Sequence, residues 1–112
     1  GPYCTATIYG GVIYMSGMIG VNPQTGKAPE GGTLAQAAQA FENIKTVLGE
    51  LGADTGDVLK TTVYLTHIAD FGEVNKLYAE VFGPDYPART CVEVSALPMG
   101  LSIEVECIAR AK

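Results

Sequence analysis

Two segments with helical periodicity, set among strand-like segments, most constrain how this chain can fold. The first begins at Thr33 and Gln36, which form a capping-box pattern, and ends at Gly52. The second begins near Asp70 and ends at Gly83 and Pro84. Their apolar residues recur at helical spacing: Ala37, Phe41, Ile44, Leu48 and Leu51 in the first, and Phe71, Val74, Leu77, Tyr78, Val81 and Phe82 in the second.

The segments around the two helices have the composition of β-strands. Residues 5–19 alternate imperfectly around Gly10 and Gly11, which indicates two strands joined by a tight turn. Residues 60–66 are rich in β-branched and aromatic side chains. Two alternating runs, 89–96 and 101–110, close the chain and are separated by a hairpin-like connection. The predicted order of elements is ββαβαββ.

This order predicts one α+β domain over residues 1–112: a mixed sheet with both helices packed on one face. The other face of the sheet then needs a different cover. Apolar residues make up 47% of the chain and charged residues only 17%, more apolar surface than a lone domain of this size easily buries. We therefore expect a partner chain on the open face.

Composition also excludes several classes of function. The net charge is −5 and Lys and Arg form no run, so nucleic acid is not an expected partner. No apolar run is long enough to span a membrane. Cys4, Cys91 and Cys107 lie far apart and match neither a metal site nor a disulfide framework. We expect a cytoplasmic protein with no metal and no cofactor.

The two closing strands carry the residues best suited to chemistry. Period-two alternation puts Arg89 and Cys91 on one face of the first, and Glu104 and Glu106 on the polar face of the second. Antiparallel pairing would bring a guanidinium, a thiol and carboxylates to a common surface, where Arg can grip a substrate carboxylate and Glu can steer a water. The alternatives remain a solvated strand face for the charges, and, for Cys91, a small buried hydrophobe or a nucleophile paired with His67.

Several motifs resemble one known family. Residues 87–94, Pro-Ala-Arg-Thr-Cys-Val-Glu-Val, followed by Leu97-Pro98 and by Ile-Glu-Val-Glu at 103–106, resemble the signature of the RidA (YjgF) family of enamine/imine deaminases. Further matches are Gly1-Pro2-Tyr3, Ser16-Gly17, Val21-Asn22-Pro23, Thr25-Gly26 and Lys60-Thr61-Thr62-Val63. The resemblance implies a chorismate-mutase-like fold, a homotrimer that forms a barrel with sites in the clefts between subunits, and hydrolysis of 2-imino acids to 2-oxo acids and ammonia without a cofactor.

The resemblance also implies roles for matching residues. Arg89 would bind the substrate carboxylate together with the backbone amide of Gly17. Glu104 would hold and orient the attacking water, and Tyr3 would close the pocket and contribute its hydroxyl.

Three further residues would line the site. The backbone carbonyl of Cys91 would accept from the imine nitrogen, while Ser16 and Asn75 would lie next to the substrate. Thr5 and Met18 depart from the family, which commonly has Gln at both positions, and these changes could reshape the pocket or the packing next to it.

Those two departures keep a second hypothesis open, a metabolite-binding or regulatory trimer without turnover. Two other activities are weaker candidates. The acidic balance argues against the RNA cleavage or translation inhibition ascribed to some family members, and chorismate mutase chemistry rests on similarity of fold alone.

Overall fold

Both predicted helices and all five predicted strand regions are present in the computed structural model, which describes residues 1–112. The strands are β1 (Ala6–Tyr9), β2 (Val12–Met15), β3 (Met18–Ile19), β4 (Val58–Leu65), β5 (Ala88–Glu93) and β6 (Ile103–Arg110). The helices are α1 (Gly32–Glu50) and α2 (Phe71–Phe82), and short 3₁₀ turns occur at Thr55–Asp57, Ile68–Asp70 and Pro98–Gly100. A sixth strand arises because the predicted second strand is interrupted at Ser16 and Gly17.

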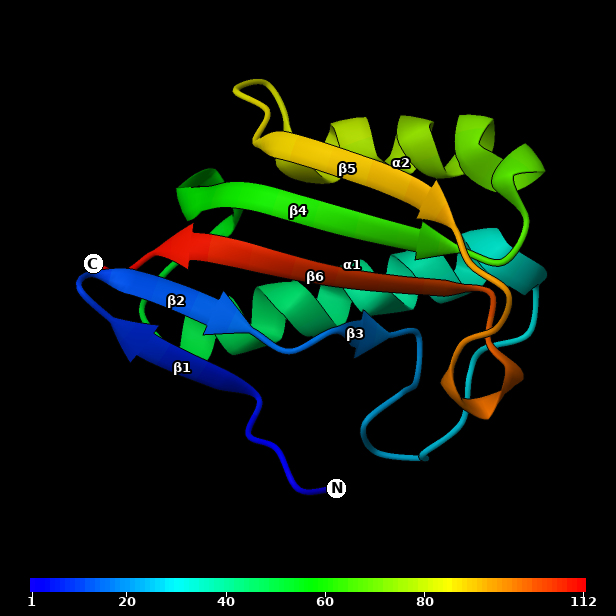
Figure 1. Ribbon diagram of the computed structural model, residues 1–112, viewed down its shortest axis with the longest axis horizontal. Helices are drawn as coiled ribbons and strands as arrows, with labels where there is room; N and C mark the ends of the chain where they lie inside the picture. The colour runs from blue at the N-terminus through cyan, green and yellow to red at the C-terminus, as the bar shows by residue number, and fades with distance from the viewer.

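The strands form one mixed sheet in the order β1-β2-β6-β4-β5, and β3 also pairs with β6. The predicted antiparallel hairpin of the last two strands is wrong. β5 pairs with β4 in parallel, β6 pairs with β4 antiparallel, and β4 lies between them. Figure 1 shows β5 at one edge of the sheet and β6 in the middle. Local alternation identified both strands, but it carries no information about which strand each one pairs with.

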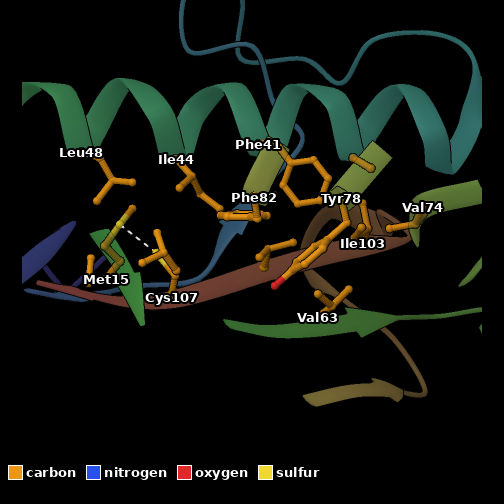
Figure 2. Close-up of a cluster of buried hydrophobic side chains, with 14 of the residues drawn as sticks. Met15, Phe41, Ile44, Leu48, Val63, Val74, Tyr78, Phe82, Ile103 and Cys107 are labelled. Atoms are coloured by element: carbon orange, nitrogen blue, oxygen red, sulfur yellow. Dashed lines mark hydrogen bonds between the residues drawn. The ribbon is translucent and has the colours of Figure 1, made fainter. Parts of the chain in front are cut away.

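Both helices pack behind the same face of the sheet, as predicted (Figure 1). The apolar faces of α1 and α2 meet the inward side chains of the central strands, and Figure 2 shows this core. The rings of Phe41 and Phe82 meet edge to face, with centroids 5.6 Å apart. Tyr78 is also buried, and its hydroxyl shares a 2.7 Å hydrogen bond with Thr61 of β4, so no polar group is left unsatisfied there.

The predicted capping box of the first helix is wrong. α1 begins after Gly31, whose backbone has a φ of 116°, and no side chain caps it. The Thr33 hydroxyl instead donates to Asp70 at 2.7 Å, and the Gln36 side-chain oxygen accepts from the Ser102 amide at 2.9 Å. These contacts tie the start of α1 to the start of β6 and to the turn before α2, so tertiary contacts take both side chains away from the local motif.

The opposite face of the sheet has no cover within this chain. Tyr14 of β2 is 46% exposed and Val92 of β5 is 38% exposed. Such an apolar surface on a sheet is typical of a face that contacts another chain. Neither helix is both long enough and apolar enough to cross a membrane.

Candidate active site

Arg89 lies on the helix-covered face, at the edge of the sheet. It is paired with Thr61 in the register of β4 and β5, and its guanidinium lies over two aromatic rings of α2. The guanidinium carbon is 4.6 Å from the centroid of Tyr78 and 5.1 Å from that of Phe71. One guanidinium nitrogen donates to the side-chain oxygen of Asn75 at 2.8 Å. Two rings and an amide therefore hold the guanidinium in position.

No acidic side chain neutralises this guanidinium. The four ion pairs of the chain use Lys45, Arg110 and Lys112 as their cations, and Arg89 takes part in none of them. Arg89 is half-buried and borders a cavity of about 420 Å³. The cavity is lined by Asn75, Tyr78, Ala79, Tyr86, Pro87 and Arg89. A fixed cation without a counter-charge, next to an open cavity, is suited to bind a small anion such as a carboxylate.

Cys91 lies two residues further along β5, on the same side as Arg89. Burial raises the pKa of the Cys91 thiol, although the charge of Arg89 opposes this effect. His67 is exposed and shares a 3.1 Å hydrogen bond with its neighbour Thr66. A thiol with a raised pKa is a poor nucleophile, so of the two roles considered for Cys91 the small buried side chain is the one that this environment favours.

Glu104 lies on the open face of the sheet, in β6. Its backbone pairs with Ile19 of β3 on one side and Tyr64 of β4 on the other. Gly17, in the interruption before β3, approaches so closely that a Cβ atom there would collide with the Glu104 carboxylate. Burial raises the pKa of Glu104, and the neighbouring negative charge of Glu106 raises it further. The carboxyl therefore accepts a proton more readily, and holds it more firmly, than an ordinary surface glutamate.

Ser16 and Tyr3 lie close to Gly17. The Ser16 hydroxyl donates to the Cys4 carbonyl at 2.7 Å, and the Ser16 amide donates to the Thr5 carbonyl at 2.9 Å. These bonds hold the segment before β1 against the interruption between β2 and β3. Tyr3, Thr5, Ser16, Gly17 and Met18 line one end of a cleft of about 640 Å³, whose other wall is α1. The two positions that depart from the family pattern are thus part of this cleft.

The predicted site residues fall into two groups that do not meet within one chain. Arg89, Cys91 and Asn75 lie together, and Glu104 and Gly17 lie together. Because β4 separates β5 from β6, the two strands are two strand spacings apart, roughly 10 Å. Side chains of the groups also point to opposite faces of the sheet. The expectation that the guanidinium, thiol and carboxylates share one surface is therefore wrong for the single chain.

Sequence reasoning missed three contacts, two of Arg89 and one of Glu106. Phe71 and Tyr78 were assigned only to the helix core, yet both also support the Arg89 guanidinium. Asn75, four residues after Phe71, puts a polar group beside that face, and this spacing could have indicated a second role for the two rings. The hydrogen bond from the Tyr64 hydroxyl to Glu106 was also missed, since it depends on the unpredicted pairing of β4 with β6.

Comparisons with known sequences agree over nearly the whole chain. The sequence model of the family described as endoribonuclease L-PSP matches residues 1–111. A RutC family protein of Pyrococcus abyssi is 45% identical over 109 residues, which cover 97% of this chain and 86% of that protein. The 2-iminobutanoate/2-iminopropanoate deaminase of Homo sapiens is 42% identical over 109 residues, covering 97% of this chain and 80% of the human protein.

Solved structures agree equally well. The crystal structure of RidA from the Antarctic bacterium Psychrobacter sp. superimposes with a TM-score of 0.94 at 40% identity, covering 98% of this chain and 89% of that one. The yjgF gene product of E. coli gives a TM-score of 0.92 at 39% identity, covering 100% and 90% of the two chains. Sequence, fold and the positions of the signature residues lead to one assignment: this chain belongs to the RidA (YjgF) family, which is also described as the endoribonuclease L-PSP family.

Proposed function

We propose that this protein hydrolyses reactive 2-imino acids, such as those derived from 2-aminoacrylate and its homologues, to 2-oxo acids and ammonia. The observation that carries the proposal is the Arg89 guanidinium, held over two rings beside a cavity and without an acidic partner. A 2-imino acid brings the carboxylate that this cation lacks. The human relative named as a 2-iminobutanoate/2-iminopropanoate deaminase supports the same reaction.

The proposed site is completed by a second copy of the chain. Arg89 and Glu104 point to opposite faces of one sheet, and a small imino acid cannot contact both within one chain. Arg89, Cys91 and Asn75 of one copy would face Tyr3, Ser16, Gly17 and Glu104 of the next. Head-to-tail contacts close into a ring when the rotation between neighbouring copies divides a full turn, and we propose a homotrimer with three sites. The uncovered apolar face of the sheet supports such an assembly.

Each proposed step moves a proton through Glu104. The substrate carboxylate binds Arg89 and the Gly17 amide, and Glu104 orients a water against the imine carbon. Water oxygen bonds to that carbon while Glu104 takes one water proton and delivers it to nitrogen, which receives the C=N electron pair. The hydroxyl proton of the resulting carbinolamine then passes through Glu104 to nitrogen. The C–N bond breaks, ammonia leaves, and C=O forms.

The remaining groups have supporting roles. The Cys91 backbone carbonyl would accept a hydrogen bond from the imine nitrogen, and the Tyr3 hydroxyl would close the pocket. No cofactor is needed because imines already hydrolyse in water, so orientation in a cleft supplies much of the acceleration. A cytoplasmic location remains part of the proposal and rests on the three free cysteines, Cys4, Cys91 and Cys107.

A coupled assay tests the proposal. A dehydratase that releases 2-aminoacrylate supplies the imine, and the rate of pyruvate release is followed with and without this protein. We expect a clear increase above the buffer rate. An unchanged rate on imines derived from alanine, aminobutyrate and bulkier amino acids would contradict the proposal.

A binding protein without turnover is the second candidate, because Thr5 and Met18 line the cleft beside Gly17 and replace the glutamines common in the family. Calorimetric binding of a 2-oxo acid with no hydrolysis of any imine would favour it.

RNA cleavage is less well supported, although the family description names an endoribonuclease. The chain has 7 basic and 12 acidic residues, and three of the basic ones, Lys45, Arg110 and Lys112, are paired with acids. Little positive charge is left to bind phosphates. Tight, strongly salt-dependent retention of RNA in a filter-binding assay would reverse this judgement.

A further inference from the structure

Two carboxylates and one tyrosine hydroxyl lie together on the open face of the sheet. Glu104 and Glu106 are two residues apart on β6 and point to the same side, about 7 Å apart along the strand. Tyr64 of β4 is the register partner of Glu104, yet its hydroxyl donates a hydrogen bond to a Glu106 oxygen. The tyrosine thus reaches diagonally across the strands and fixes the Glu106 carboxylate beside Glu104.

We propose that Glu106, held by the Tyr64 hydroxyl, is a positioning residue whose negative charge sets the pH range in which Glu104 exchanges protons with water and with the leaving nitrogen. The inference rests on the proposed function and deepens it. Glu106 touches no reacting atom in this scheme and acts only through Glu104.

The surroundings of the two carboxylates allow the charge of Glu106 to act on Glu104. Both carboxylates are half-buried, so water screens their repulsion less than at a fully exposed surface. Burial raises the pKa of Glu104, and Glu106 adds to that rise. The hydrogen bond to Glu106 is also the main cause of the raised pKa of Tyr64, which keeps the phenol protonated and able to donate.

Within one chain, neither carboxylate forms an ion pair with a cation on this face. The other titratable side chains that alternation puts on this side of the sheet are Tyr9, Tyr14, Lys60 and Arg110. Arg110 is bound to Asp57 at 2.8 Å. The backbone of Lys60 pairs with Ile108, which is four residues along β6 from Glu104 and two from Glu106. Lys60 and Glu106 line one small cavity. β3 presents Ile19 beside Glu104, and β5 presents Ala88, Thr90 and Val92 to this face. Glu106 is therefore the nearest charge to Glu104 within one chain. In the proposed assembly Arg89 of the neighbouring copy also faces Glu104, and its positive charge opposes the effect of Glu106 on the pKa of Glu104.

This arrangement suits the double role of Glu104. A carboxyl that takes a proton from water and then gives it to nitrogen works best when its pKa lies near the working pH. An ordinary glutamate, with a pKa of about 4.3, returns a proton too readily to hold it at neutral pH and accepts one too weakly. A neighbouring carboxylate raises the pKa of Glu104 toward neutral pH without taking part in the reaction.

Replacement of the charge by an amide of the same shape tests the inference. In Glu106→Gln, the side-chain oxygen can still accept from Tyr64, so the sheet should stay folded, which a thermal melt checks. We expect the protonation midpoint of Glu104, followed by carboxyl ¹³C NMR, to fall by about half a pH unit. Glu80→Gln on α2 removes one exposed charge from the other side of the sheet and should leave the midpoint unchanged.

Enzyme kinetics give the second measurement. The acid limb of kcat/KM should move to lower pH in Glu106→Gln by the same amount as the Glu104 midpoint. Tyr64→Phe frees the Glu106 carboxylate to turn toward water and should give a smaller shift in the same direction. An unchanged Glu104 midpoint in folded Glu106→Gln overturns the inference. If the wild type hydrolyses no imine, the proposed function fails, and the NMR titration still decides whether Glu106 acts on Glu104.

Discussion

The two faces of the sheet hold the candidate groups in different ways. On the helix-covered face, Arg89 is fixed by the side chains of α2: two rings beneath it and an amide beside it. On the open face, the backbone of Glu104 is held between β3 and β4, and its carboxylate lies against Gly17. The cation depends on helix packing and the carboxylate on strand pairing. Each half can therefore be changed without disturbing the other.

Loss of the cation should have the largest effect. Arg89→Ala removes the only group that can bind the substrate carboxylate by a charge, and we expect imine hydrolysis to fall by roughly 1,000-fold or more. The core beneath Arg89 is untouched, so the oligomer should stay folded. Lys76→Ala, which removes an exposed cation from the same helix, serves as the matched control. Near-normal turnover in Arg89→Ala would remove this residue from the mechanism.

Substitution of Glu104, on the open face, should have a smaller effect and should lower turnover without weakening binding. Glu104→Gln keeps the shape of the side chain and removes its proton exchange, so kcat should fall by about 100-fold. Binding of a 2-oxo acid, measured by calorimetry, should stay close to that of the wild type because Arg89 is intact. Equal losses of binding and turnover would mean that Glu104 holds substrate rather than water.

A mixture of these two inactive variants tests whether the halves meet between copies. Co-refolded Arg89→Ala and Glu104→Gln chains form some interfaces in which both contributing halves are intact. Random mixing in a head-to-tail ring leaves about a quarter of the sites complete, so activity should return to about a quarter of the wild-type value. Each variant refolded alone is the control. Failure to recover activity from mixed oligomers would place both groups of one site in the same chain.

Asp57 contrasts with Arg89, because the charge of Asp57 is compensated by two cations. Its side chain is only 2% exposed and binds Arg110 at 2.8 Å and Lys112 at 3.2 Å, which hold its pKa at about 2, below the usual 3.8. A lowered pKa in the folded state means stability that is present above pH 3.8 and is lost as the pH falls toward 2. Urea unfolding should show this loss in the wild type, and Asp57→Asn should lack this part of the pH dependence.

The sequence predicted the helices and strands better than it predicted how the strands pair. The helices and most strand segments followed from periodicity, and the family signature made Arg89 and Glu104 candidates for the site. Strand pairing did not follow, because alternation assigns a residue to a face only relative to its own strand. Arg89 and Glu104 therefore looked compatible with one surface until the position of β4 between β5 and β6 was known. The Thr33 capping box failed for a related reason, since Asp70 and Ser102 compete for its hydroxyl across the fold.

The missing side chain at Gly17 has a consequence for how this protein can vary. The three atoms that a methyl group there would meet first all belong to the Glu104 side chain, so the glutamate could yield while the strands stayed in place. A Gly17→Ala chain would then retain the fold and the Arg89 pocket but carry its carboxylate in the wrong position. One methyl group could therefore remove catalysis while the fold and ligand binding remain. Proteins that evolve from such a chain could bind a ligand without converting it.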